Sequence, residues 1–108
     1  MPSVKFGKIK TKLQSKHPIY AKYDGERNPR KLCPYVLGYK KENSAESDGN
    51  ERVLCYQLEG PDPNSGWRCF DVSKLEIVDP APPEADWEDR PEYTAKWQNG
   101  VQKVKHKV

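Results

Sequence analysis

The segment 67–77, WRCFDVSKLEI, carries the pattern that decides the fold of this 108-residue chain. Residues 67–72 are rich in side chains that favour β-strands, and Ser73 with Lys74 marks a short turn. Residues 75–78 then alternate between apolar and polar side chains, which is the period of a strand with one buried face. Two short strands separated by a tight turn are therefore predicted here.

Upstream, the sequence predicts two more strands that are joined by a tight reversal. Residues 19–23 alternate in polarity and end at Asp24-Gly25, the strongest short turn signal in the chain. Residues 30–40 are rich in β-forming side chains and follow as the second strand. Because proline cannot donate a backbone hydrogen bond, Pro34 is expected at an edge or a bulge of that strand.

A further strand completes the β region. It spans residues 52–58 and lies between two polar, turn-forming loops at 42–50 and 60–66. With the pair at 67–78, the sequence predicts five short strands with no helix between them. This arrangement is typical of a mainly β domain, and it predicts a small five-stranded antiparallel β-barrel.

Two segments flank the predicted barrel, so the chain divides into a basic N-terminal arm at 1–17, the barrel at 18–79, and a Pro-rich linker with a C-terminal extension at 80–108. In the arm, apolar side chains between residues 4 and 13 have a loose helical spacing. They indicate either a short amphipathic helix or an ordered arm, and Pro18 ends any helix before it.

A helix is also predicted in the C-terminal extension. Its apolar side chains recur at intervals of four, four, three and four, and Gly100 marks where the helix should break or start. The stripe consists of Tyr93, Trp97, Val101, Val104 and Val108. It could pack back onto the barrel, or it could form a dimer or partner contact.

Positive charge is concentrated toward the start of the chain. Residues 1–31 hold nine Lys and Arg against two acids, whereas residues 32–80 hold five against nine. A second, smaller basic cluster lies at 103–107. Such asymmetry favours an anionic partner such as nucleic acid, a nucleotide or an acidic protein face, although lysines that serve only solubility give the same pattern.

Signals of catalysis, metal binding and membrane insertion are lacking in the sequence. The three cysteines, Cys33, Cys55 and Cys69, include no Cys-x-x-Cys pair, which indicates reduced thiols rather than a disulfide framework or a zinc site. No Gly-rich phosphate loop or nucleophile motif occurs, so we expect neither an enzyme nor a cofactor. No apolar run of about 18 residues and no signal peptide is present, which predicts a soluble, cytoplasmic protein.

The order of several motifs resembles one known family. They are Tyr20-x-x-Tyr23-Asp24-Gly25, then Arg30-x-Leu32-x-Pro34-Tyr35-x-Leu37, and finally Arg68-x-Phe70-x-Val72-x-Lys74-Leu75 with Ile77. Together they resemble the WYL domain, an SH3-like or Sm-like β-barrel common in bacterial transcriptional regulators. The resemblance covers about residues 19–79. The Trp-Tyr-Leu tripeptide that names the family is absent near residues 53–55, and Lys74 stands where the family usually has a second arginine.

This resemblance implies a binding function. In the family, basic and aromatic side chains on the barrel are thought to bind a negatively charged ligand or a nucleic-acid segment, and the matching cations here are Arg30, Arg68 and Lys74. Trp67 and Tyr35 are the aromatic candidates for stacking on a base. Each cation is also compatible with an internal salt bridge, and Trp67 with a lid over one barrel end. We therefore expect a non-catalytic regulatory domain for a nucleotide or single-stranded nucleic acid, as a monomer or homodimer.

Two other functions fit the same sequence. One is a protein-interaction or oligomerisation module that uses the C-terminal aromatic stripe. The other is non-specific nucleic-acid binding by the N-terminal lysines, because electrostatic contacts to phosphates need no particular side-chain geometry.

Overall fold

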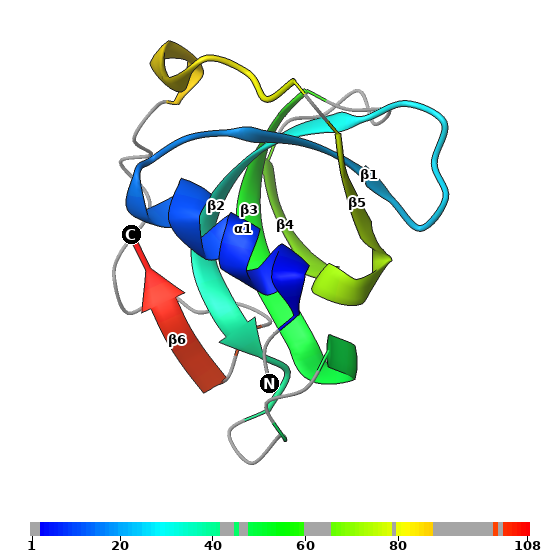
Figure 1. Ribbon diagram of the computed structural model, residues 1–108, viewed down its shortest axis with the longest axis vertical. Helices are drawn as coiled ribbons and strands as arrows, with labels where there is room; N and C mark the ends of the chain where they lie inside the picture. Colours follow the sequence, from blue (N-terminus) through cyan, green and yellow to red (C-terminus); the bar gives the residue numbers. More distant parts are fainter. Residues whose placement is uncertain are drawn as a thin grey trace.

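The computed structural model describes residues 3–41, 45, 48–59, 66–78, 80–87, 101 and 103–108. Within these residues the chain forms one α-helix, six β-strands and three short 3-10 helices, arranged as Figure 1 shows. In chain order the elements are α1 (Val4–Gln14), β1 (Ile19–Tyr23), β2 (Arg30–Tyr39), η1 (Asp48–Asn50), β3 (Glu51–Glu59), β4 (Gly66–Asp71), η2 (Val72–Lys74), β5 (Leu75–Val78), η3 (Glu84–Asp86) and β6 (Lys103–Lys107).

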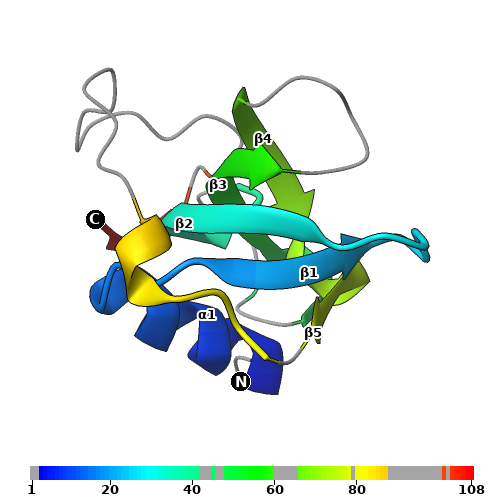
Figure 2. The same cartoon turned by 90° about the horizontal axis from the view of Figure 1, so that it is seen from above.

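All six strands belong to one antiparallel sheet that is organised around β2. The strand order is β4-β3-β2-β1-β5, with β6 also paired to β2. β3 follows one edge of β2, whereas the other edge is shared between β1 at its start and β6 from Val36 to Tyr39. Figure 2 shows β1 and β2 passing in front of β3 and β4, so the sheet is strongly curved.

The mainly β, antiparallel prediction for residues 18–79 is confirmed, but closure into a barrel is not. β4 and β5 lie at opposite ends of the strand order and are linked in sequence by η2, at the turn predicted for Ser73 and Lys74. No pairing joins β4 to β5 in the part of the chain that the structure describes. The observed sheet is therefore an open, curved one.

A bulge at Pro34 changes the faces to which β2 side chains point. The register between β2 and β3 shifts between Pro34 and Val36, which confirms the predicted edge or bulge position. Because a bulge inserts an extra residue, the alternation of side chains changes phase across it. Accordingly, Leu32 and Leu37 belong to one hydrophobic cluster, whereas Tyr35 and Val36 belong to another.

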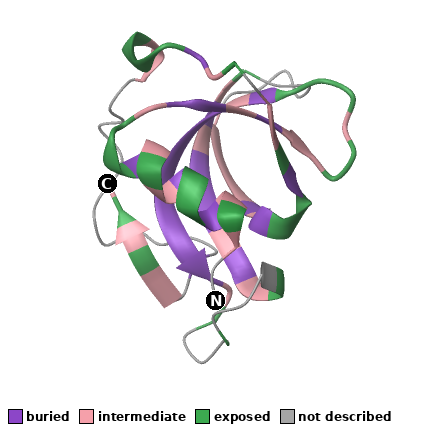
Figure 3. Cartoon of the chain, viewed as in Figure 1, coloured by how far each residue is buried: buried purple, intermediate pink, exposed green. Residues whose placement is uncertain are grey.

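These two hydrophobic clusters lie on opposite faces of the sheet. Alternation along β3 requires this, because Val53 belongs to the first cluster and its neighbour Leu54 to the second. α1 covers the first cluster with three side chains that are each at most 4% exposed: Phe6, Ile9 and Leu13. The second is covered by residues late in the chain, including Trp87 and the fully buried Val101. Figure 3 shows the resulting burial along β2.

The N-terminal segment forms a helix rather than an extended arm, and its start is fixed by side chains. Ser3 Oγ accepts a hydrogen bond from the backbone N–H of Phe6 at 3.1 Å, as expected of an N-cap residue. The buried carboxylate of Glu51 accepts from the Ser3 backbone N–H at 2.9 Å and from Ser3 Oγ at 2.6 Å. Since Glu51 begins β3, these bonds attach the helix to the sheet. The helix ends before Pro18, as predicted.

Near the C-terminus the predicted helix is wrong for the residues that the structure describes. β6 is a strand, and it pairs antiparallel with the second half of β2. The reason is that β1 pairs only with the first residues of β2, which leaves backbone groups on the remaining edge for another strand. Tyr93, Trp97 and Gly100 lie outside the described residues.

The segment predicted as a Pro-rich linker packs against the sheet where it is described. Pro82 is buried, and the Trp87 ring stacks on Tyr35 with 4.9 Å between ring centroids. Asp86 forms a salt bridge of 2.8 Å with Lys31 in β2. In the described part of the chain, α1 is too short and too polar to cross a membrane.

Candidate functional site

Arg30, the first cation predicted for the site, is committed to internal contacts. Its side chain donates to both carboxylate oxygens of Glu26, at 2.8 and 2.7 Å, and to Gln57 Oε1 at 2.7 Å. The guanidinium carbon also lies 5.5 Å from the centroid of the Phe70 ring. Hydrogen bonding to Arg30 lowers the pKa of Glu26, which is the signature of a stable ion pair. Arg30 is 8% exposed, so it is the internal salt bridge, not the ligand contact, that the structure supports.

Tyr35 and Trp67 are packed together rather than displayed as a stacking platform. Tyr35 is 1% exposed and lies edge-to-face with Trp67 at 4.9 Å. Trp67 is half-buried and also meets Tyr56 at 5.2 Å. The three rings belong to the second hydrophobic cluster. Tyr35 therefore has no surface with which to stack on a base.

The predicted set of site residues is divided between the two faces of the sheet. Alternation along β4 puts Arg68 on the same face as Phe70, a member of the first cluster, and opposite Trp67. Arg68 is half-buried, and its Nη1 lies 3.4 Å from the Trp67 carbonyl oxygen. Lys74 is exposed on η2, beyond the end of β4. Arginine and aromatic side chains thus do not form one joint surface.

A different basic surface forms where α1 and β6 meet. Figure 1 shows the two elements side by side, and the Phe6 ring lies 6.0 Å from the His106 ring in an edge-to-face contact. We call this surface the basic seam and define it by Lys10 in α1 and by three residues of β6: Lys103, Lys105 and His106. Lys107 pairs with Val36 of the second cluster and therefore faces the other side of the sheet. The seam joins segments that are almost 100 residues apart in the sequence.

The charge of the protein is strongly polarised toward the elements that carry the seam. The segments 3–23 and 101–108 together hold nine lysines and no acidic residue, whereas the rest of the chain holds ten Lys and Arg against 16 Asp and Glu. Lys10 forms no salt bridge with any residue that the structure describes. This face is therefore a region of positive potential.

His106 lies close to two of these lysines. Burial lowers its pKa, and the nearby charges of Lys10 and Lys105 lower it further. At neutral pH the imidazole is neutral, so the positive charge of the seam comes from its lysines. The Phe6 contact and the β2 pairing of His106 hold β6 against the helix.

The sequence contained both halves of the seam but not their proximity. Each half appears as a lysine-rich segment without acids, at 3–23 and 101–108. The sequence did not predict the pairing of β6 with β2, because the spacing of the apolar side chains in the C-terminal segment predicted a helix. Only that pairing brings His106 to the side of α1.

Metal binding and thiol chemistry find little support in the described residues. They contain no group of three or more His, Cys, Asp and Glu side chains that could hold a metal ion. The cysteines are free thiols, and burial raises the pKa of Cys55 well above its usual value, which disfavours the reactive thiolate. Comparison with known protein families, curated proteins and solved structures finds no match to this chain.

Proposed function

We propose that this protein is a non-catalytic binding domain that recognises the phosphate backbone of a nucleic acid with the basic seam. The observation that carries the proposal is the meeting of α1 and β6, two lysine-rich elements without acidic residues, along one side of the molecule. Lysines in such an arrangement neutralise phosphates and release counterions, which gives affinity without a requirement for sequence. The seam lysines thus make the contacts to the anionic ligand that the sequence predicted for Arg30 and Arg68.

The dimensions of the seam suit a few phosphates. β6, which carries most of the seam residues, has five residues and extends over about 17 Å at about 3.4 Å per residue. That length corresponds to roughly five phosphates of one strand, at about 3.4 Å per phosphate in a duplex. Aromatic side chains contribute little here, because Tyr39 and Phe6 beneath the seam are buried. Electrostatic contact to the backbone, rather than stacking on bases, is the recognition mode that fits.

We also propose that the open, curved sheet is a divergent, incompletely closed relative of the SH3-like barrel of the WYL type. Five antiparallel strands within residues 19–78 and the short turn η2 between β4 and β5 support this assignment. A regulatory role would then follow from the family rather than from the seam. By contrast, interaction through the C-terminal aromatic stripe loses support, because Val101 and Val104 pack against the second hydrophobic cluster.

Salt-dependent binding tests the nucleic-acid proposal. The probe is a fluorescein-labelled single strand of about 20 nucleotides and mixed sequence, and the readout is anisotropy between low and moderate salt. Lys10→Gln with Lys105→Gln removes two seam charges. The plot of log affinity against log salt should become shallower by about 1.4, and affinity at about 0.1 M salt should fall roughly 25-fold.

The matched control removes two charges elsewhere, with Arg27→Gln and Lys74→Gln on the exposed turn side of the molecule. It should change affinity less than about threefold and leave the salt slope unchanged. Since Lys74 belongs to the binding site predicted from the sequence, the control also tests whether that site binds nucleic acid. Equal losses in both double variants, or binding indifferent to salt, would reject the seam.

A further inference from the structure

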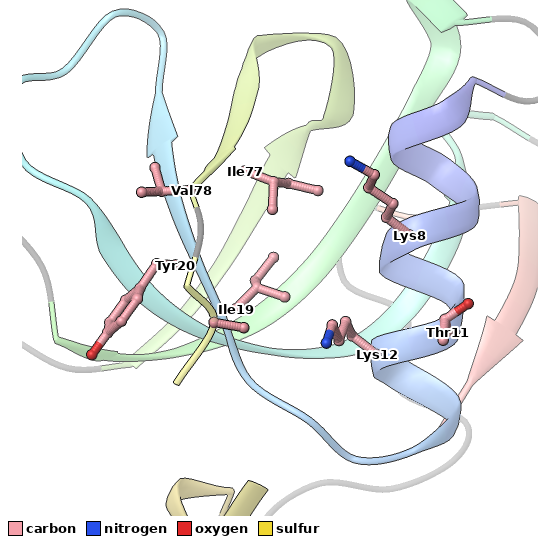
Figure 4. Close-up of a pocket in the computed structure, with 8 residues that line it drawn as sticks. Lys8, Thr11, Lys12, Ile19, Tyr20, Ile77 and Val78 are labelled. Carbon is pink, nitrogen blue, oxygen red and sulfur yellow. The ribbon is translucent and has the colours of Figure 1, made fainter. Parts of the chain in front are cut away.

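A pocket lies on the other flank of α1, away from the seam. It has a volume of about 300 Å³ and is bounded by the helix on one side and by β1, β5 and Ala81 on the other. Figure 4 shows Lys8 and Lys12 extending from the helix toward the strands, while Ile19 and Ile77 point toward the helix. The pocket thus has an apolar floor and two ammonium groups at its edge.

Helix geometry explains why lysines border this pocket. Lys8 and Lys12 are four residues apart and share one flank, whereas Lys10 is two residues from each and points to the opposite side. Lys5, on the same flank one turn earlier, donates to the carbonyl oxygens of Ser73 at 3.2 Å and Leu75 at 2.8 Å. Those bonds confirm that this flank faces the start of β5.

The floor of the pocket comes from two neighbouring strands. Ile77 pairs with Ala21 in the β1–β5 ladder, so Ile19 and Ile77 lie on the same face of the sheet. Ile19 is buried and Ile77 is half-buried at the margin of the first hydrophobic cluster. The helix covers them here with lysine side chains rather than with apolar groups. An apolar body placed on this floor would therefore be sheltered from water.

The charges select the kind of ligand. Lys8 and Lys12 have the same charge at positions i and i+4, an arrangement that destabilises a helix. Neither lysine forms a salt bridge with a described residue, and no acidic residue is among the described residues that line the pocket. An anion between the two ammonium groups would relieve their repulsion. A neutral or cationic ligand would not.

We propose that this pocket binds a small organic anion that has one apolar body and one carboxylate or phosphate group. The body rests on Ile19 and Ile77, and the anionic group lies between Lys8 and Lys12. The volume is at the lower end of the range for small-molecule sites, so the body is about the size of a short aliphatic chain or an aromatic ring. This site is separate from the seam and does not depend on nucleic-acid binding.

Four eight-carbon probes at submicellar concentration test the ligand class: octanoate, octyl phosphate, octanol and octylamine. Binding is followed by the methyl NMR signals of Ile19 and Ile77. The dissociation constant of octanoate or octyl phosphate, taken from the saturation of these shifts, should be at least tenfold lower than that of octanol, and octylamine should bind weakest. The tighter of the two anions identifies the headgroup. Equal affinity for octanol and both anions, or no saturable shift with either anion, overturns the proposal.

Matched variants locate the site. Lys8→Gln with Lys12→Gln should weaken binding of the anion at least tenfold, whereas Lys10→Gln on the opposite flank should change it less than twofold. Ala81→Phe should fill the pocket and abolish binding, whereas Ala85→Phe, at an exposed position outside the lining, should not. Circular dichroism and urea unfolding confirm that each variant is folded. If filling the pocket or removing its lysines leaves anion affinity unchanged, the ligand binds elsewhere and the proposal is wrong.

Discussion

Gly38 is the residue on which the attachment of β6 depends, and Gly38→Ala is the perturbation that tests it. A Cβ atom at this position would lie 1.9 Å from the carbonyl oxygen of Lys103 and 3.0 Å from Cγ1 of Val101. The closer obstacle is backbone, so no side-chain rotation can relieve it. β6 must then move away from β2 or the bend in β2 must change.

The size of the effect follows from these distances. Restoring even a 3.0 Å contact with Lys103 requires a shift of about 1.1 Å. A backbone hydrogen bond of ordinary length near 2.9 Å stretches to about 4.0 Å under such a shift and is lost, at about 1 kcal/mol each. Partial exposure of Val101, now fully buried, adds up to about 2 kcal/mol. We therefore expect Gly38→Ala to lower the free energy of unfolding by about 2–4 kcal/mol.

Urea unfolding measures this loss, and amide hydrogen exchange shows where it arises. Exchange should accelerate in β6 and in Val36–Tyr39 of β2 but not in β1. The matched control is Gly7→Ala in α1, where an added Cβ meets nothing within 4 Å. That control should stabilise the protein by about 0.5–1 kcal/mol, because alanine favours a helix over glycine. A Gly38→Ala variant within about 0.5 kcal/mol of the parent, with unchanged exchange in β6, would refute the reasoning.

Three further predictions concern ionisable groups that are buried or half-buried. Glu51→Gln should lower the free energy of unfolding by about 1–3 kcal/mol because it weakens the bonds to Ser3, and a double-mutant cycle with Ser3→Ala should show coupling. The hydrogen bond to Arg30 lowers the pKa of Glu26 below 4.5. The stability that this ion pair contributes is therefore present above pH 4.5 and is lost as the pH falls through the lower pKa of the folded state. Acid unfolding of Glu26→Gln should lack this loss of stability. The pKa of His106 is lowered below 6.5, so the parent protein should lose stability as the pH falls from 6.5 toward that lower pKa. His106→Gln should not show this loss. An NMR titration midpoint of His106 at or above pH 6.5 would contradict the prediction.

The sequence predicted the strands well because their signals are local. The predicted segment 19–23 coincides with β1, and residues 75–78 with β5, since alternation and a tight turn define both. The bulge at Pro34 was also predictable, because proline lacks the donor that a regular ladder needs. Each of these features depends on residues within a few positions of one another.

The C-terminal strand and the site depended on contacts that no local pattern encodes. Val101 and Val104 fit a helical spacing, but the exposed edge of β2 imposed a strand on this region. The charge of Arg30 predicts contact with an anion, but Glu26 and Gln57 of the fold itself accept hydrogen bonds from its guanidinium. The identity of a cation predicts that it will meet an anion. It does not predict whether that anion is a ligand or a neighbour in the fold.

The burial of the aromatics limits what the surface can recognise. With Tyr35 inside the second cluster, the described residues form no arginine-and-ring surface of the kind expected from the sequence, and the described charges that remain for recognition are mainly lysines. A lysine ammonium acts as a compact point charge with little geometric selectivity, unlike the planar guanidinium fork. Selectivity must then come from what surrounds the charge. An open seam favours an extended polyanion, whereas a pocket with an apolar floor favours a small amphipathic anion.

Both proposed surfaces lie on α1, so the attachment of the helix separates specific effects from general ones. Glu51 fixes the start of α1 through Ser3, and it touches neither the seam nor the pocket. Loosening the helix with Glu51→Gln should therefore weaken nucleic-acid binding and octanoate binding together. Lys10→Gln should weaken only the first, and Lys8→Gln with Lys12→Gln chiefly the second. If the two activities instead fall together in every lysine variant, α1 carries one diffuse charge effect and not two sites.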